Sequence, residues 1–209
     1  EQDPQNRLLA RGPRFRLSGE LIRDHMLKAS GKLSGKMFGP GVYPPQPLTV
    51  LAHAFGNKSW NASKGEDRYR RSVYTFIKRT APFAGFMTFD GTSGENCLAK
   101  RDRSNTPLQA LTLLNDEMYL ELARAAGHEV HQKKDDPVES LFRRFLTRPP
   151  KQSETDALQA YFDQQLQRLK KGAIKSSEIT DNPKACPELA GKVLLARAIM
   201  NLDEAITKP

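Results

Sequence analysis

Apolar positions recur every three or four residues along much of the chain, which is the spacing of amphipathic α-helices. The first such stripe follows Ser18, whose hydroxyl is suited to capping a helix, and it ends at Gly31, a residue type that commonly terminates one. His25 lies within the stripe and has no second histidine one helical turn away. The pattern therefore predicts a helix from Ser18 to Gly31, with His25 as a half-buried side chain rather than a metal ligand.

A second stretch of helical spacing covers residues 66–80, and we predict an amphipathic helix there. Its apolar positions are Tyr69, Val73, Phe76, Ile77 and Thr80. The opposite side carries Arg68, Arg71 and Arg79, and arginine forks can hold a carboxylate, sulfate or phosphate with two parallel hydrogen bonds. The alternative is that these arginines pair with acidic side chains of the same chain. Those acidic residues are Asp90, Glu95, Asp102 and Asp116.

Proline positions divide the middle of the chain. Pro82 ends the second helix, so the residues up to 103 are expected to be irregular, with residues 86–90 briefly extended. Thr106 before Pro107 predicts a new helix, because proline is favourable at the first helical position. We expect Leu108 and Leu111 of this helix to face inward.

The C-terminal half shows regular helix starts. They are indicated by capping residues or proline at Asn115, Asp136, Ser153 and Pro187. The second and third carry an acid three residues later, as in a capping box, and residues 170–183 resemble a polar linker. The helix capped by Asn115 is expected to run to about His131. We therefore predict an all-α fold in which residues 1–209 form a single irregular helical domain.

Residues 31–65 interrupt the helical pattern. This segment is rich in glycine and proline, with breakers such as Gly39-Pro40-Gly41, and we predict a long loop that is either functional or mobile. Trp60, the single tryptophan, lies within it. We expect Trp60 to pack the loop down; the alternative is that it stacks on a ligand.

Charge is distributed unevenly along the chain. The net charge is +9, and residues 1–104 hold 18 Lys and Arg against 9 Asp and Glu, whereas the remaining residues are balanced. Such an excess suits an acidic partner, an anionic polysaccharide or nucleic acid; the alternative is a solvated basic surface. The apolar stretches fall short of the about 20 residues that a membrane span needs, so we predict no span.

Cysteines and known motifs limit the chemistry. Cys97 and Cys186 stand far apart without a CxxC pair, so they form either one disulfide or two free thiols, and a zinc site is not predicted. The P-loop, GxGxxG, GxSxG, HExxH and CxxCH motifs do not occur. We therefore expect neither a metal site nor a cofactor in this chain.

Our candidate site lies around the segment from Ser104 to Gln109. A helix N-terminus beside Arg101 and Arg103 is suited to binding an anion. The predicted ligand-binding residues are Arg68, Arg71, Arg79, Arg101, Arg103, Asn105 and Gln109. We expect their guanidinium groups to converge beside the proline-initiated helix. A structural role of the polar segment, in capping that helix, is the alternative.

Two carboxylates allow a catalytic hypothesis. Asp90 and Glu95 are weak candidates for the acid pair of a glycoside hydrolase, which places two carboxyl groups about 5 to 10 Å apart across a sugar. In a loop rich in arginine, such acids more often serve as salt-bridge partners.

The residues of this region resemble the PSD-type domain of unknown function, which is found in large secreted or envelope proteins of planctomycetes and their relatives. The similar segments are Asn6–Arg11, Tyr69–Arg79, Phe89–Asp90, Cys97, Arg101, Arg103, Asn105–Asp116 and Met200–Glu204. The resemblance implies a secreted, periplasmic or cell-envelope location. It also implies that the chain is the C-terminal part of a longer protein, in which a preceding cytochrome-c-like domain would carry haem c.

These observations lead to three hypotheses. The first is a non-catalytic binding or assembly module of an exported multidomain protein, whose partners are other domains of that protein, a redox partner or an anionic polysaccharide. The second is an enzyme of extracellular polysaccharide breakdown that uses Asp90 and Glu95. The third is a nucleic-acid-binding domain that uses the basic half of the chain.

Overall fold

The computed structural model describes residues 3–10, 12, 15–51, 59–95 and 97–208, and the predicted all-α fold is confirmed. The main helices are α1 (Gly19–Ala29), α3 (Pro107–Asn115), α4 (Glu117–Lys133), α5 (Pro137–Leu146), α6 (Gln152–Lys170) and α8 (Pro187–Met200). The shorter helices and 3-10 turns are η1 (Leu48–Leu51), η2 (Gly65–Tyr69), η3 (Ser72–Tyr74), α2 (Ala84–Thr88), α7 (Ser176–Thr180) and α9 (Asp203–Ile206). Strands β1 (Phe15–Arg16) and β2 (Thr207–Lys208) pair antiparallel.

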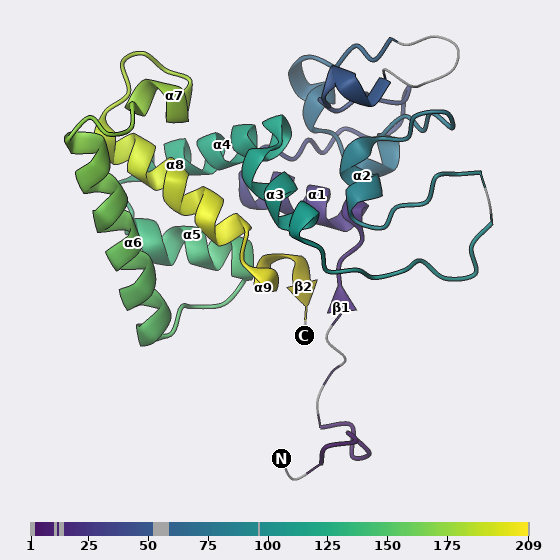
Figure 1. The fold of residues 1–209 in the computed structure, drawn as a ribbon, viewed down its shortest axis with the longest axis horizontal. Coiled ribbons are helices and arrows are strands. Elements are labelled where there is room, and N and C mark those ends of the chain that lie inside the picture. The colour runs from purple at the N-terminus through teal and green to yellow at the C-terminus, as the bar shows by residue number, and fades with distance from the viewer. Residues whose placement is uncertain (1–2, 11, 13–14, 52–58, 96, 209) are drawn as a thin grey trace.

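Helix α8 is the centre of the core. It packs against α4, α5 and α6, and Figure 1 shows it crossing between α6 and α4. Its side chains Ala190, Leu195 and Ile199 have no exposed surface. Buried apolar residues of α8 occupy most sides of the helix. A helix that is apolar on all sides is stable only when neighbouring helices cover it, as they do here. The C-terminal half of the chain therefore forms a helical bundle.

Four of the predicted helix starts are correct, those at Ser18, Thr106, Asp136 and Pro187. The Thr106 hydroxyl accepts from the Gln109 N–H ahead of Pro107, and the Asp136 carboxylate accepts from the Glu139 N–H at 2.7 Å. These starts depend on contacts between residues that are close in sequence, which is why local patterns identify them.

Other boundaries differ from the predictions. Asp116, not Asn115, caps α4, because its carboxylate accepts from the Met118 N–H at 2.9 Å. Helix α6 begins after Lys151, whose N–H is held by Glu154, so the predicted capping box at Ser153 is wrong. Residues 84–88 are helical rather than extended, and α7 lies inside the predicted linker.

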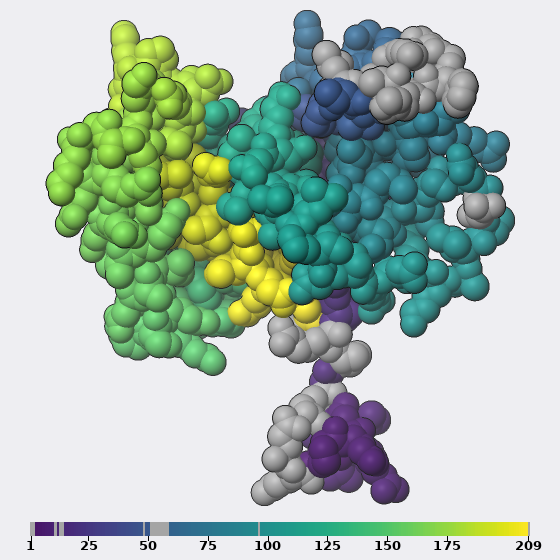
Figure 2. Space-filling view, in the orientation of Figure 1, coloured from purple at the N-terminus to yellow at the C-terminus, as the bar shows by residue number. Residues whose placement is uncertain are grey.

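Residues 15–17 and residues 206–208 meet at the small sheet. Phe15 pairs with Lys208, and the Leu17 N–H donates to the Ile206 carbonyl at 2.8 Å. Residues 3–10 form an arm that extends away from the body (Figures 1 and 2). Near its tip, the Asp3 carboxylate accepts from the backbone N–H groups of Arg7 and Leu8.

The predicted helix over residues 66–80 is wrong. The segment forms the two short turns η2 and η3, and Arg70 and Thr75 are extended. Its backbone bonds to the preceding loop instead: the Val42 N–H donates to the Tyr74 carbonyl and the Phe76 N–H donates to the Val42 carbonyl, both at 2.8 Å. Pairing with another segment replaced the helical hydrogen bonds that the spacing predicted.

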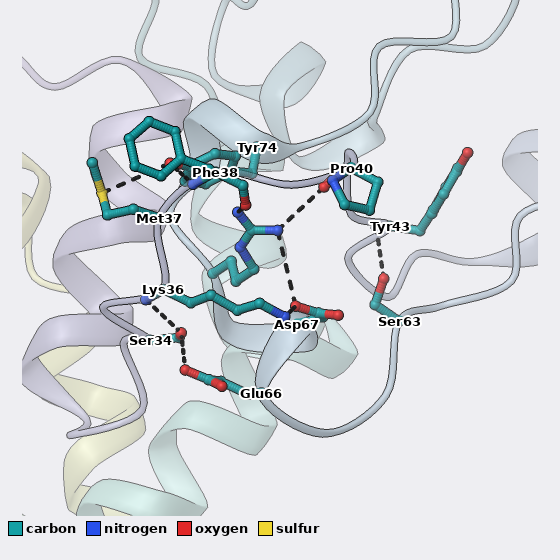
Figure 3. Close-up of polar contacts among 11 residues, drawn as sticks. Ser34, Lys36, Met37, Phe38, Pro40, Tyr43, Ser63, Glu66, Asp67 and Tyr74 are labelled. Atoms are coloured by element: carbon teal, nitrogen blue, oxygen red, sulfur yellow. Dashed lines mark hydrogen bonds and ion pairs between the residues drawn. The ribbon is translucent and has the colours of Figure 1, made fainter.

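The described parts of the 31–65 segment are packed down by polar contacts, as Figure 3 shows. Arg70 is fully buried; it donates to the carbonyls of Phe38 and Pro40, and its guanidinium lies 3.8 Å from the centroid of the Tyr74 ring. The Tyr43 N–H donates to the Ser63 hydroxyl at 2.9 Å. A buried arginine therefore holds the loop in place by donating to its carbonyls.

Trp60 and His25 both have structural environments. Trp60 is 5% exposed, donates to the Pro44 carbonyl at 2.7 Å and stacks on Phe83, so it packs the loop down as expected. His25 is partly buried, and its Nε2 lies 2.7 Å from the Phe145 carbonyl oxygen. Burial lowers the pKa of His25.

A bidentate ion pair between Arg144 and Glu129 joins α5 to α4, and it predicts that the stability of the protein depends on pH. Hydrogen bonds from Arg144 and Lys133 lower the pKa of Glu129 to about 2, from an ordinary value of 4.5. Because the folded-state pKa is depressed, this pair contributes stability above about pH 4.5, and the contribution is lost as the pH falls towards 2. Arg144→Met is therefore expected to lower the urea midpoint at pH 7 and to lower it less at pH 3.

The matched control for that prediction is Arg143→Met. Among the residues that the structure describes, Arg143 pairs only with Glu139, one helical turn away, and both side chains are mostly exposed. Its loss is therefore expected to change the midpoint little at either pH. A midpoint difference for Arg144→Met that stays constant between pH 7 and pH 3 would contradict the assigned role of Glu129.

Candidate functional site

Helix α1 positions the segment that follows η2. Arg23 is 1% exposed and donates to the carbonyls of Arg70 at 2.7 Å and Arg68 at 3.0 Å. Asp24 accepts from the Ser72 N–H at 2.7 Å. Burial lowers the pKa of Arg23 to about 10, which leaves it charged at neutral pH. These contacts hold residues 71–77, which we call the 71–77 strip, against α1.

A hollow of about 220 Å³ opens beside β1 and the start of α1, and we call it the basic pocket. Its charged lining residues are Arg16, Asp90, Lys100, Arg101, Asp102 and Arg103. The remaining lining residues, among them Phe15, Leu21 and Phe89, are mostly apolar. Four cationic and two acidic side chains therefore line a small hollow whose walls are partly apolar.

The four cations of the basic pocket differ in how they are paired. Arg16 donates to Gln109 at 3.1 Å and to Asp203 at 2.8 Å, and Arg101 donates to both oxygens of Glu20 at 2.9 Å. Within the described ranges, the side chains of Lys100 and Arg103 form no hydrogen bond or ion pair, although Arg103 lies 5.7 Å from the Phe15 ring centroid. Two positive charges are therefore available to a ligand.

Asp90 lines the basic pocket, and Gln109 is joined to the pocket through its bond to Arg16. Asp90 has a left-handed backbone, and its carboxylate accepts from both the N–H and the hydroxyl of Ser104 at 2.8 Å. Gln109 is buried; its amide donates to Ser104 and to the Thr88 carbonyl while its oxygen accepts from Arg16. Both residues hold Ser104, which lies just before the start of α3. Asn105 is exposed and lines a smaller hollow with Arg16 and Gln109.

A second hollow of about 390 Å³ adjoins the first, and we call it the apolar cleft. Its apolar lining residues are Leu21, Val73, Phe76, Ile77, Pro82, Phe83 and Phe86. Leu21 and Arg101 line both hollows. Arg71 stands at the rim of the cleft, half exposed, with its Nε 3.7 Å from Asp24.

The structure brings together some of the predicted site residues and separates others. Arg71, Arg101 and Arg103 line the two adjoining hollows. Arg68 lies elsewhere, because its guanidinium is bonded to Glu121 at 2.9 Å and to Glu117 at 3.0 Å. Arg79 and Glu95 are exposed and are not among the residues that line either hollow.

Sequence reasoning missed two cations of the pocket. Lys100 directly precedes Arg101, so the short basic run from Lys100 to Arg103 was a usable signal. Arg16 joins the pocket through Gln109, which is 93 residues away, and no local pattern indicates such a contact. The predicted partners of Arg68 were also wrong, since Glu117 and Glu121 are the acids that pair with it.

Three further observations bear on chemistry and location. Cys97 and Cys186 are both free thiols. Within the described ranges, no group of three or more His, Cys, Asp and Glu side chains is arranged to hold a metal ion. Of the helices in the described part of the chain, none combines the length and the apolar character required to cross a bilayer.

Comparison with known proteins gives one match. A sequence model of the family described as PSD1, protein of unknown function (DUF1553), matches residues 1–162. No curated protein and no solved structure matches the chain.

Proposed function

We propose a binding function for this chain, which belongs to the PSD1 family of proteins of unknown function (DUF1553). The chain is a non-catalytic binding module that holds an anionic group in the basic pocket. The observation that carries this proposal is the pair of uncommitted cations, Lys100 and Arg103, beside the paired Arg16 and Arg101. A carboxylate or sulfate group placed between them gains charge-assisted hydrogen bonds, which are stronger than neutral ones.

The acidic residues of the region support binding over hydrolysis. The carboxylate of Asp90 is engaged by Ser104, whose N–H and hydroxyl both donate to it. Glu95 lies exposed on the same loop and is not part of the basic pocket lining. Polysaccharide hydrolysis by Asp90 and Glu95 stays a prediction, and its direct test is loss of turnover in Asp90→Asn with an unchanged fold.

The partners that fit this proposal carry exposed negative charge. An anionic polysaccharide presents carboxylate or sulfate groups, and an acidic redox partner such as a cytochrome-c-like domain presents carboxylates. The resemblance to domains of exported proteins supports such partners and a location outside the cytoplasm. Nucleic acid is the further alternative, and binding to DNA or RNA that weakens steeply with salt would favour it.

The proposal predicts that removing two positive charges at the basic pocket weakens anion binding more than removing two positive charges elsewhere on the surface. Lys100→Gln with Arg103→Gln is expected to weaken binding of labelled hexagalacturonate or hexaglutamate by about tenfold, because about 1.4 kcal/mol of binding energy is lost. Fluorescence anisotropy at low ionic strength measures the dissociation constants. Either anion serves as a probe, since both present rows of carboxylates.

The matched control removes two exposed lysines outside both hollows, Lys171→Gln with Lys184→Gln. Both double variants lose the same net charge, so the control is expected to change the dissociation constant less than twofold. Equal weakening in the two double variants would mean that binding depends on net charge alone, and the proposed pocket would then be wrong.

A further inference from the structure

We propose that the basic pocket and the apolar cleft form one groove, which binds an extended peptide segment carrying acidic side chains next to large aliphatic ones. This inference rests on the proposed anion binding and names the class of partner. The two hollows adjoin, since Leu21 and Arg101 line both of them. A ligand that fills both ends must therefore combine negative charge with apolar surface.

The walls of the apolar cleft favour aliphatic side chains. Val73 is 75% exposed, Ile77 is 70% exposed and Leu21 is 52% exposed, and all three line the cleft. Burying such side chains against a ligand is favourable by about 25 cal/mol for each Å² of apolar surface removed from water. A sugar chain, whose hydroxyl groups need hydrogen-bond partners, gains little from these aliphatic walls.

The exposed apolar side chains are presented by a strip with fixed backbone contacts. The Ser72 N–H is held by Asp24, and the backbone of Tyr74 and Phe76 is paired with Val42. Arg23 fixes the start of the strip through the Arg70 carbonyl. Val73 and Ile77 therefore remain exposed because the strip cannot turn them inward without breaking these bonds.

The floor of the cleft contains a polar group that lacks a partner. The hydroxyl of Thr75 is buried and has no hydrogen-bond partner in the described part of the chain, and Thr75 lines the cleft. An unmet buried hydroxyl costs about 1 to 3 kcal/mol. A peptide backbone supplies an acceptor at every residue and a donor at every residue except proline. A peptide in the cleft can therefore form a hydrogen bond with the Thr75 hydroxyl once the Thr75 side chain turns toward it.

Charge complementarity decides that the peptide is acidic. Lys100 and Arg103 are uncommitted at one end of the groove, and Arg71 is half exposed at its rim. Of the acids that line the groove, Glu20 is engaged by Arg101, Asp24 by the Ser72 N–H and Asp90 by Ser104. Asp102 is exposed, so the three cations Lys100, Arg103 and Arg71 still outnumber it. An acidic residue in the basic pocket with aliphatic residues in the cleft satisfies both ends of the groove.

The test compares three labelled probes on the 209-residue chain by fluorescence anisotropy. The first is a peptide of about twelve residues that alternates Asp or Glu with Leu, the second replaces each Leu by Ser, and the third is hexagalacturonate. The leucine peptide is expected to bind at least about tenfold more tightly than the serine peptide. Val73→Ser with Ile77→Ser is expected to remove this difference between the two peptides.

A control variant uses exposed leucines on α3 that are not in the groove. Leu108→Ser with Leu111→Ser removes comparable apolar surface and is expected to leave the preference for the leucine peptide intact. Circular dichroism confirms that each variant is folded. Because Val73 and Ile77 are exposed, their replacement is not expected to unfold the protein.

The outcomes separate this inference from the proposed function. Equal binding of the two peptides, or tighter binding of hexagalacturonate, overturns the peptide groove and leaves anion binding intact. Binding that is about tenfold weaker in Lys100→Gln with Arg103→Gln, together with a preference for the leucine peptide in the parent chain, supports both. The chain could also self-associate, and Val73→Ser with Ile77→Ser could abolish that self-association. This result overturns the inference, because the cleft would then be occupied by a second copy.

Discussion

Replacing Arg23 with alanine is expected to lower the free energy of unfolding by about 4 kcal/mol, because a buried charged hydrogen-bond network loses its centre. The guanidinium donates to the carbonyls of Arg68 and Arg70 and to the Ser72 hydroxyl at 3.3 Å. None of these groups gains a new donor in the variant, and a cavity remains where the side chain was. Since domains are stable by only about 5 to 15 kcal/mol, such a loss is large.

The same substitution has a second, separable consequence. With the start of the 71–77 strip released from α1, the apolar cleft loses its shape, so the preference for the leucine peptide is expected to disappear even where the protein is still folded. Urea denaturation measures the stability, and fluorescence anisotropy in the cold measures the binding. Arg143→Ala is the control, since the ion pair of that exposed arginine with Glu139 spans one helical turn, and a change within about 0.5 kcal/mol is expected. A comparably small loss for Arg23→Ala would show that Arg23 does not hold the strip.

Gly127→Ala is expected to destabilise the protein by about 3 kcal/mol, although alanine is normally the better helix former. Gly127 lies in α4 where it crosses α8. A Cβ atom at this position would lie 2.7 Å from Val193 Cγ2 and 2.9 Å from the Val193 backbone nitrogen. Backbone cannot move aside as a flexible side chain does, so α8 must shift and the core around it must repack.

The control for this prediction is Gly35→Ala. A methyl group added at Gly35 would have open space within 4 Å, and the backbone there is not left-handed, so a change within about 0.5 kcal/mol is expected. Urea denaturation of both variants measures the difference. Equal stability of Gly127→Ala and the parent chain would mean that α4 and α8 do not approach as closely as described.

Local sequence patterns predicted the helices that are stabilised by local contacts. The hydroxyl of Thr106 and the carboxylate of Asp136 accept from backbone N–H groups three residues ahead, so the residues that define these starts are close together in the sequence. The apolar face of α1 and the start of α8 at Pro187 were predictable for the same reason. The all-α class follows from these elements taken together.

Tertiary contacts overruled the pattern in the 66–80 segment and on α3. Helical spacing was present from Tyr69 to Ile77, yet pairing with Val42 and anchoring by Arg23 produced short 3-10 turns joined by extended residues. On α3, Leu108 and Leu111 are exposed, so the prediction that they face inward is wrong. Gln109 is buried instead, because its side chain joins Arg16, Ser104 and Thr88. Periodicity does not report such long-range hydrogen bonds.

The sequence by itself determined the helical class, most helix starts and the excess of arginine in the first half of the chain. Only the tertiary structure decided which of those arginines are available: Arg68 is neutralised by Glu117 and Glu121, whereas Arg103 faces the basic pocket. The physical reason is the range of the interactions. A cap or an apolar stripe depends on residues a few positions apart, but the pairing of a charge depends on which distant segments the fold brings within a few ångströms of it.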